Sequence, residues 1–295
     1  MSAGLRKTVH LAVSGDAFKA LYFDWERDEL RPNLAFVDAA GSVVYEINEV
    51  GLKGDPLDPS RKLAVAWGDS VVFGAGRSWP CLLDGFAPEY QFLNGGIEGD
   101  GYTNILRRAA KFNREHRLAL NLLMLGWHPH SMFLFENATA EPRMSIGIWQ
   151  RMLGRGQTAG PSNRELGATL DAFLRAVPNT VLLTMPTALN PQLIDRDLSE
   201  FFTEGDDRTA FSFLGRLPYS VAIQRGAFAF IRERNDIARE VCARLNIRVV
   251  DLAERFNTQG AADFRQCFHD ILHFRIGAYP LVAEAVYDGV KDLLT

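Results

Sequence analysis

From residue 62 to the C-terminus, short apolar runs alternate with amphipathic helical patterns, and this alternation restricts the fold more than any other feature. Five runs have the length and apolar content of buried strands, at residues 63–68, 90–94, 118–126, 179–185 and 247–251. Helical periodicity is found at residues 79–87, 101–115, 163–177, 223–245 and 276–293. Strands that alternate with helices form parallel sheets with helices on both faces. The sequence therefore predicts an α/β fold, a three-layer α/β/α arrangement around a five-stranded parallel sheet.

The first 60 residues have a different pattern. Short β-type runs are separated by Gly, Asp, Asn and Pro, at residues 8–13, 19–24, 33–37 and 42–47. A small antiparallel sheet or a pair of hairpins is the structure that we expect there. Residues 54–60 contain two prolines and read as a linker. We therefore predict two domains, a β-rich N-terminal extension at 1–60 and the α/β domain at 61–295.

Two long stretches, residues 128–162 and 186–222, fit the alternation poorly. Both combine aromatic side chains with glycines and prolines. Long connections in compact domains are often lids or binding loops. Extra short helices at the edge of the domain are an equal alternative on this evidence.

Charge and apolar content argue against several classes of partner. The formal net charge is −4, from 32 basic and 36 acidic residues, and no basic run is long enough to track nucleic acid phosphates. No stretch has the roughly 18 continuous apolar residues of a membrane span, and charges soon interrupt the N-terminal apolar run. The three cysteines lack metal-type spacing. We expect a cytoplasmic protein with reduced thiols and no nucleic acid partner.

Two segments about 200 residues apart contain the groups needed for nucleophilic acyl transfer. Ser70 ends Gly-Asp-Ser directly after the apolar run at 63–67, and Asp270 and His273 lie in Asp-x-x-His near the C-terminus. A serine hydroxyl attacks a carbonyl only when a base takes its proton, and histidine, oriented by a carboxylate, suits that task. A metal site at His128 and His130 is disfavoured because no carboxylate or cysteine accompanies them. The glycine-rich stretches lack the phosphate-loop lysine and the full dinucleotide fingerprint, so we expect no cofactor.

Five blocks of the chain, in order, resemble those of the SGNH (GDSL-type) hydrolases. They are Gly68-Asp69-Ser70-Val71, Trp79-Pro80-Cys81-Leu82-Leu83, Asn94-Gly95-Gly96-Ile97-Glu98-Gly99-Asp100, Leu125-Gly126-Trp127-His128 and Asp270-Ile271-Leu272-His273. The resemblance covers residues 62 to about 290 and implies a flavodoxin-like fold with the nucleophile at the end of its first strand. It also implies a catalytic triad of Ser70, His273 and Asp270.

The resemblance further implies an oxyanion hole, formed by the backbone N–H groups of Ser70 and Gly99 and a side chain of the fourth block. That block has His128 where the family has asparagine. A neutral imidazole can donate one N–H in place of the amide, or His128 can lie outside the site and leave two donors. Removing one such donor costs about 10²–10³ in rate.

The expected function is that of a serine esterase, acting on a small-molecule or carbohydrate ester with a short acyl or O-acetyl group. The family resemblance leaves two alternatives open. One is acyl transfer to an acceptor hydroxyl by the same triad. The other is a binding or scaffold protein that keeps the fold with weak catalysis.

Overall fold

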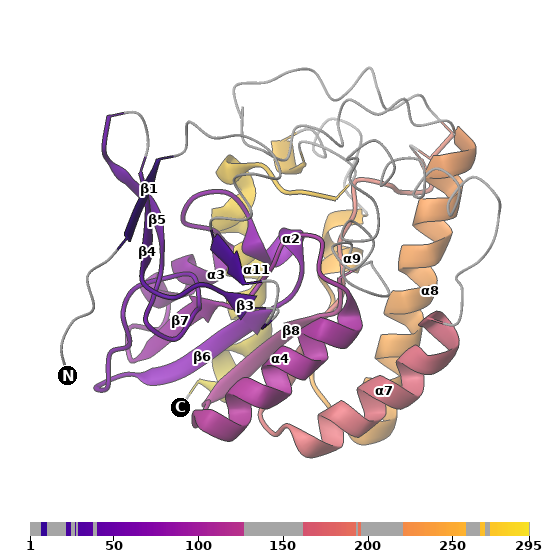
Figure 1. The fold of residues 1–295 in the computed structure, drawn as a ribbon. Helices are drawn as coiled ribbons and strands as arrows, with labels where there is room; N and C mark the ends of the chain where they lie inside the picture. Colours follow the sequence, from indigo (N-terminus) through magenta and orange to yellow (C-terminus); the bar gives the residue numbers. More distant parts are fainter. Residues whose placement is uncertain are drawn as a thin grey trace.

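In the computed structural model the described residues comprise ten segments: 7–10, 22–24, 27, 29–37, 40–126, 162–192, 194–195, 221–257, 266–268 and 272–294. Five parallel strands form the central sheet (Figure 1): β6 (Lys62–Trp67), β7 (Tyr90–Asn94), β8 (Leu120–Met124), β9 (Thr180–Leu183) and β10 (Val249–Val250). The predicted five-stranded parallel sheet is confirmed, and each predicted strand overlaps an observed one.

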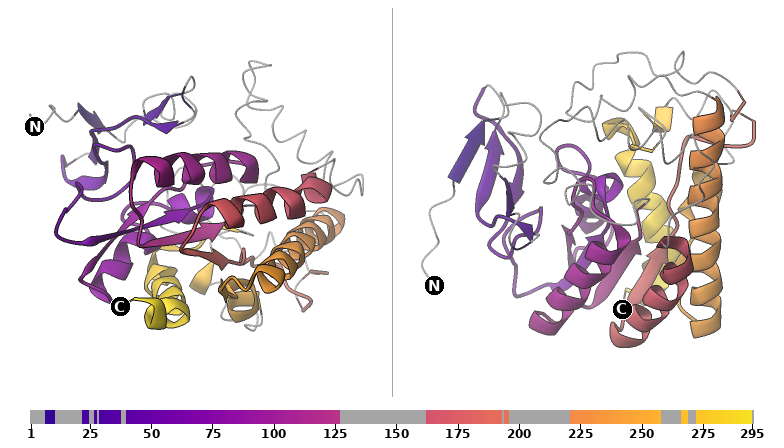
Figure 2. Two further views of the ribbon diagram at one scale, coloured as in Figure 1. Left: turned by 90° about the horizontal axis from the view of Figure 1, so that it is seen from below. Right: turned by 45° about the vertical axis from the view of Figure 1, so that its right-hand side comes forward.

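Helices cover both faces of this sheet, as Figure 2 shows for α4 and α7 on one side and α11 on the other. One face packs against α4 (Tyr102–Glu115), α7 (Ser162–Ala176) and α8 (Val221–Leu245). The other packs against α3 (Trp79–Leu82), α9 (Leu252–Asn257) and α11 (Tyr279–Val290). Short 3-10 turns at Leu83–Gly85, Ile276–Ala278 and Lys291–Leu293 flank α3 and α11. The three-layer α/β/α prediction is therefore confirmed.

The strand order places a reversal of direction beside β6. The order is β10-β9-β8-β6-β7, so the chain adds β7 on one side of β6 and then returns to add β8 on the other. In open parallel sheets, ligands bind outside the carboxyl ends of the strands at such a switch point. The segments that directly follow β6 and β8 are therefore where a site is expected.

The N-terminal extension contains a small three-stranded sheet and a separate strand pair. Strands β4 (Leu34–Val37) and β5 (Val43–Ile47) are antiparallel, as are β2 (Phe23–Asp24) and β3 (Glu29–Leu30). The expected antiparallel strands are therefore present, and strand β1 (Lys7–His10) adds a parallel pair with β4 that was not expected. A long connection joins β1 to β4, and such a connection allows the crossover that a parallel pair requires.

The segment predicted to be a linker is bonded to the edge of the central sheet. Directly before this segment, the backbone of Lys53 exchanges two hydrogen bonds of 2.9 Å with Asn94, at the end of β7. Further along, Gln91 accepts a bond from the backbone N–H of Asp58 and donates one to the carbonyl of Pro56. The extension therefore lies against β7, and the division at residue 60 stays a prediction.

Candidate active site

Ser70 is the first residue of a four-residue helix, α2 (Ser70–Phe73), which begins just after β6. Asp69 caps this helix, because its carboxylate accepts a hydrogen bond of 3.0 Å from the N–H of Val71. The capping residue of α2 is therefore Asp69, and Ser70 follows it as the first helical residue. The Ser70 side chain lies at the carboxyl end of β6 and is 9% exposed. The Asp69 cap and the end of β6 therefore fix the position of Ser70.

His273 lies next to Ser70 although more than 200 positions separate them in the sequence. Its Nε2 atom is 2.8 Å from the Oγ atom of Ser70, and the ring is buried. The residues on either side of this loop pair with each other. Phe268 and Phe274 form an isolated bridge and stack at 4.8 Å, and Arg275 donates a backbone bond of 2.8 Å to Cys267. The stacked rings of Phe268 and Phe274 therefore hold the two ends of the loop that contains His273 together. Asp270 lies outside the described residues.

Asn94, the last residue of β7, ties α2 to the loop that follows β7. Its Nδ2 atom lies 2.7 Å from the carbonyl oxygen of Val72, 3.0 Å from that of Phe73 and 2.6 Å from the Oγ of Ser78. Its Oδ1 atom accepts a bond of 2.8 Å from the N–H of Gly96. One buried amide therefore sets the distance between α2 and the loop that follows β7.

That loop contains Gly99, the predicted backbone donor to an oxyanion. Gly99 has a φ of +65°, which L side chains rarely adopt. The next residue, Asp100, forms a buried ion pair with Arg108 of α4, and Arg108 also donates a bond of 2.8 Å to the carbonyl of Gly95. Both ends of the loop are thus held by one guanidinium, which gives the backbone of Gly99 a defined place after β7.

Arg234, a residue that the sequence analysis did not single out, binds the segment that follows β8. Arg234 lies on α8, is 1% exposed and donates a bond of 2.8 Å to the carbonyl of Gly126. Its guanidinium lies over the rings of Tyr102 and Phe230, at 5.2 and 4.7 Å. Burial lowers the pKa of Arg234 to about 10, and the charge of Asp69 opposes that shift, so the side chain is cationic at neutral pH.

A signal for Arg234 was present in the sequence. The residue follows Ile231 by three positions and precedes Ala238 by four, so a charge interrupts the apolar stripe of its helix. His128, which follows Gly126 by two residues, lies outside the described residues. Most of the long stretches 128–162 and 186–222, namely residues 128–161 and 196–220, also lies outside them, so the expected role of these stretches as lids or short helices stays a prediction.

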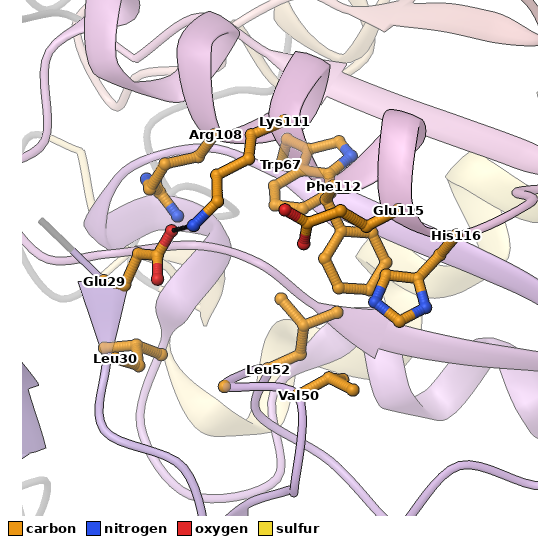
Figure 3. A pocket seen from close by; sticks show the side chains of 11 residues that line it. Glu29, Leu30, Val50, Leu52, Trp67, Arg108, Lys111, Phe112, Glu115 and His116 are labelled. Carbon is orange, nitrogen blue, oxygen red and sulfur yellow. Dashed lines mark hydrogen bonds and ion pairs between the residues drawn. The ribbon is translucent and has the colours of Figure 1, made fainter. Parts of the chain in front are cut away.

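A separate cavity of about 240 Å³ lies between the extension and α4 (Figure 3). Trp67, Phe112 and Leu52 form its apolar part, and an ion pair between Lys111 and Glu29 crosses it. Neither Ser70 nor His273 lines this cavity. Within the described segments, no three His, Cys, Asp or Glu side chains are grouped so as to hold a metal ion. No helix in the described part of the chain is long and apolar enough to cross a membrane.

Comparison with solved structures identifies the fold. A lipase/acylhydrolase from Enterococcus faecalis superposes with a TM-score of 0.50 at 16% identity, covering 78% of this chain and 96% of the other. A G-D-S-L family lipolytic protein from Veillonella parvula gives 0.49 at 14% identity, covering 77% and 97%. An acetylxylan esterase from Geobacillus stearothermophilus gives 0.47 at 14%, covering 79% and 95%.

No family model matches the sequence, and no curated protein matches it either. At such low sequence identity, structural similarity assigns the fold, whereas the activity depends on the chemistry of the site residues. Ser70 and the loop that contains Gly99 follow two strands of that fold, β6 and β7, and His273 lies next to Ser70. The chain therefore has the α/β/α fold seen in the lipase/acylhydrolase structure, the fold that its resemblance to SGNH hydrolases led us to expect.

Proposed function

We propose that this protein is a serine esterase of the SGNH (GDSL-type) hydrolase family. The observation that carries the proposal is the 2.8 Å contact between Ser70 Oγ and His273 Nε2 at the carboxyl end of β6. A general base must lie about 2.6–3.2 Å from the proton donor that it activates, and this pair satisfies that condition. Both side chains lie beside the topological switch point, where ligands bind in this class of fold.

In the proposed reaction, Ser70 Oγ attacks the carbonyl carbon of an ester while His273 Nε2 takes the hydroxyl proton. The carbonyl oxygen becomes an oxyanion, which the N–H groups of Ser70 and Gly99 stabilise together with any N–H from His128. His273 then gives its proton to the departing alcohol, and the acyl group stays on Ser70. Water, deprotonated by His273, releases the acid. Asp270 is proposed to orient the imidazole, and no cofactor takes part.

The proposed substrates are small-molecule or carbohydrate esters with a short acyl or O-acetyl group. Transfer of the acyl group to an acceptor hydroxyl would use the same first step, because the acyl-enzyme is common to both reactions. Product analysis with and without an added alcohol distinguishes the two, since only transfer forms a new ester. Hydrolysis and acyl transfer therefore differ only in the second half of the reaction, in which either water or an alcohol accepts the acyl group.

Replacing Ser70 by alanine tests the proposal. We expect wild-type protein to cleave p-nitrophenyl acetate and to react with a fluorophosphonate probe at Ser70, and the Ser70→Ala variant to lose both. Removing the nucleophile of a triad costs up to about 10⁶ in kcat. Ser60→Ala is the matched control, because Ser60 is exposed and bonds only within its own turn, to Asp58.

Two results would count against the esterase proposal. Full activity in Ser70→Ala would remove Ser70 from the mechanism. A folded wild-type protein that neither labels nor turns over esters of any chain length would favour a binding or scaffold role for the same fold.

A further inference from the structure

The helix that carries Ser70 is too short to be stable by itself. It has four residues, whereas isolated helices need about 12–15 to be stable in water. Its amino end is capped by Asp69, and its buried Val71 and Val72 pack in the core. Its carboxyl end has several carbonyl oxygens that no intrahelical N–H can reach. The position of Ser70 therefore depends on the groups that bind those carbonyls.

Lys53 of the extension reaches the carboxyl end of α2. Its Nζ atom lies 2.6 Å from the carbonyl oxygen of Phe73 and 2.9 Å from that of Gly74. The ammonium also lies over the rings of Tyr45 and Phe73, at 4.5 and 4.3 Å, and the side chain is 1% exposed. The amino group therefore donates to carbonyl oxygens that the short helix leaves without intrahelical partners. Because the backbone of Lys53 is paired with Asn94, the base of this side chain is also held.

A second residue of the extension contacts the loop that contains Gly99. The hydroxyl of Tyr22 donates a hydrogen bond to the carboxylate of Glu98, the residue before Gly99. The ring of Tyr22 stacks on Phe73, with a centroid distance of 5.9 Å and an interplanar angle of 16°. Tyr22 is fully buried, so this contact is part of the packed interior between the extension and the site.

We propose that Lys53 and Tyr22 are positioning residues, through which the N-terminal extension sets the distance between Ser70 and the backbone of Gly99. Lys53 holds the far end of the nucleophile helix, and Tyr22 holds the loop of the proposed oxyanion hole. This inference rests on the proposed function, since it assigns these contacts to the same site. The attacking hydroxyl and the oxyanion donors must match the transition state closely, and a displacement of about 1 Å costs up to about 10² in rate.

The alternative is that both contacts only stabilise the fold. The two roles differ in the kinetic constants that they change. A residue that only stabilises leaves the folded fraction fully active, so kcat and KM per folded molecule are unchanged. A positioning residue lowers kcat while KM for a small ester stays the same, because it acts on the geometry of the reacting groups.

The test uses the full-length chain with Lys53→Met and Tyr22→Phe. Met keeps the length of the lysine stem without its donors, and Phe removes one hydroxyl only. Lys291→Met and Tyr287→Phe are the matched controls, since both residues lie at the C-terminal helix, away from the extension. Each variant is assayed with p-nitrophenyl acetate and a fluorophosphonate probe, well below its unfolding temperature, and rates are normalised to folded protein by near-UV circular dichroism.

We expect Lys53→Met to lower kcat and the labelling rate by about 10- to 100-fold with KM within about twofold, and Tyr22→Phe to lower kcat by at least about threefold. Wild-type kcat in a folded Lys53→Met variant overturns the inference. If Lys53→Met does not fold, Tyr22→Phe decides, and an unchanged kcat in that variant overturns it. If the wild-type protein is inactive and unlabelled, it is the proposed function that fails.

Discussion

Lys53 places an amino group in the protein interior, and the stability of the fold should depend on pH for that reason. Burial lowers the pKa of Lys53 from 10.5 to about 7, and the nearby Cys81 and Glu98 only partly oppose this shift. The unfolded chain therefore keeps a proton on this side chain up to about pH 10, whereas the folded chain loses it near pH 7. Between these values the unfolded state binds more protons, so the free energy of unfolding rises with pH.

The expected size of this effect follows from the two pKa values. Each pH unit between them is worth about 1.4 kcal/mol, and about a quarter of the first unit is lost because the folded chain is half protonated at pH 7. Lys53 alone should thus add about 2 kcal/mol to the stability between pH 7 and pH 9. Lys53→Met removes the titration, together with the hydrogen bonds to Phe73 and Gly74. Relative to the wild type, the Lys53→Met variant should therefore lose about 2 kcal/mol more stability at pH 9 than at pH 7.

Urea unfolding at pH 7 and pH 9, followed by tryptophan fluorescence at constant ionic strength, measures this difference. Trp67 and Trp79, which are buried in the described part of the chain, report the loss of the core. Other titrating groups are common to both proteins and cancel when the variant is subtracted from the wild type. Lys291→Met, an exposed lysine paired with Asp288, should give a difference that does not change with pH. The reasoning is refuted if the gap between wild type and Lys53→Met is the same at both pH values.

Two further substitutions test the loops around the site. Arg108→Met leaves the buried carboxylate of Asp100 without its partner and should cost about 3–5 kcal/mol by urea unfolding. The exposed neighbour Arg107→Met should cost under about 0.5 kcal/mol, and equal effects of the two would contradict the role of the ion pair. Gly126→Ala places a Cβ 2.7 Å from the carboxylate of Asp69 at a φ of +65°, and should lose about 1–3 kcal/mol together with ester turnover. Unchanged unfolding would show that the cap of α2 tolerates the added methyl group.

Much of the α/β domain could be predicted because its signals are local. Apolar strand runs and helical periodicity repeat within a few residues, and the predicted helix at 101–115 differs from the observed α4 by one residue. The position of Ser70 also followed from local pattern, since a Gly-Asp-Ser after a strand places the hydroxyl at its carboxyl end. The expectation that His273 would meet Ser70 came from the family resemblance, which implies that the Gly-Asp-Ser and Asp-x-x-His blocks share one site.

Contacts between distant segments carried no such signal. Nothing near Lys53 in the sequence indicates that its ammonium will bind the carbonyls of Phe73 and Gly74, and nothing near β1 indicates that it will pair in parallel with β4. These arrangements depend on which surfaces pack together once the sheet has formed, and packing is a property of the whole chain. Periodicity and motifs therefore specified the sheet and singled out the Ser70 hydroxyl and the His273 imidazole. The contacts that hold these two side chains in place arose from long-range packing, in which a buried charge or carbonyl must find a partner.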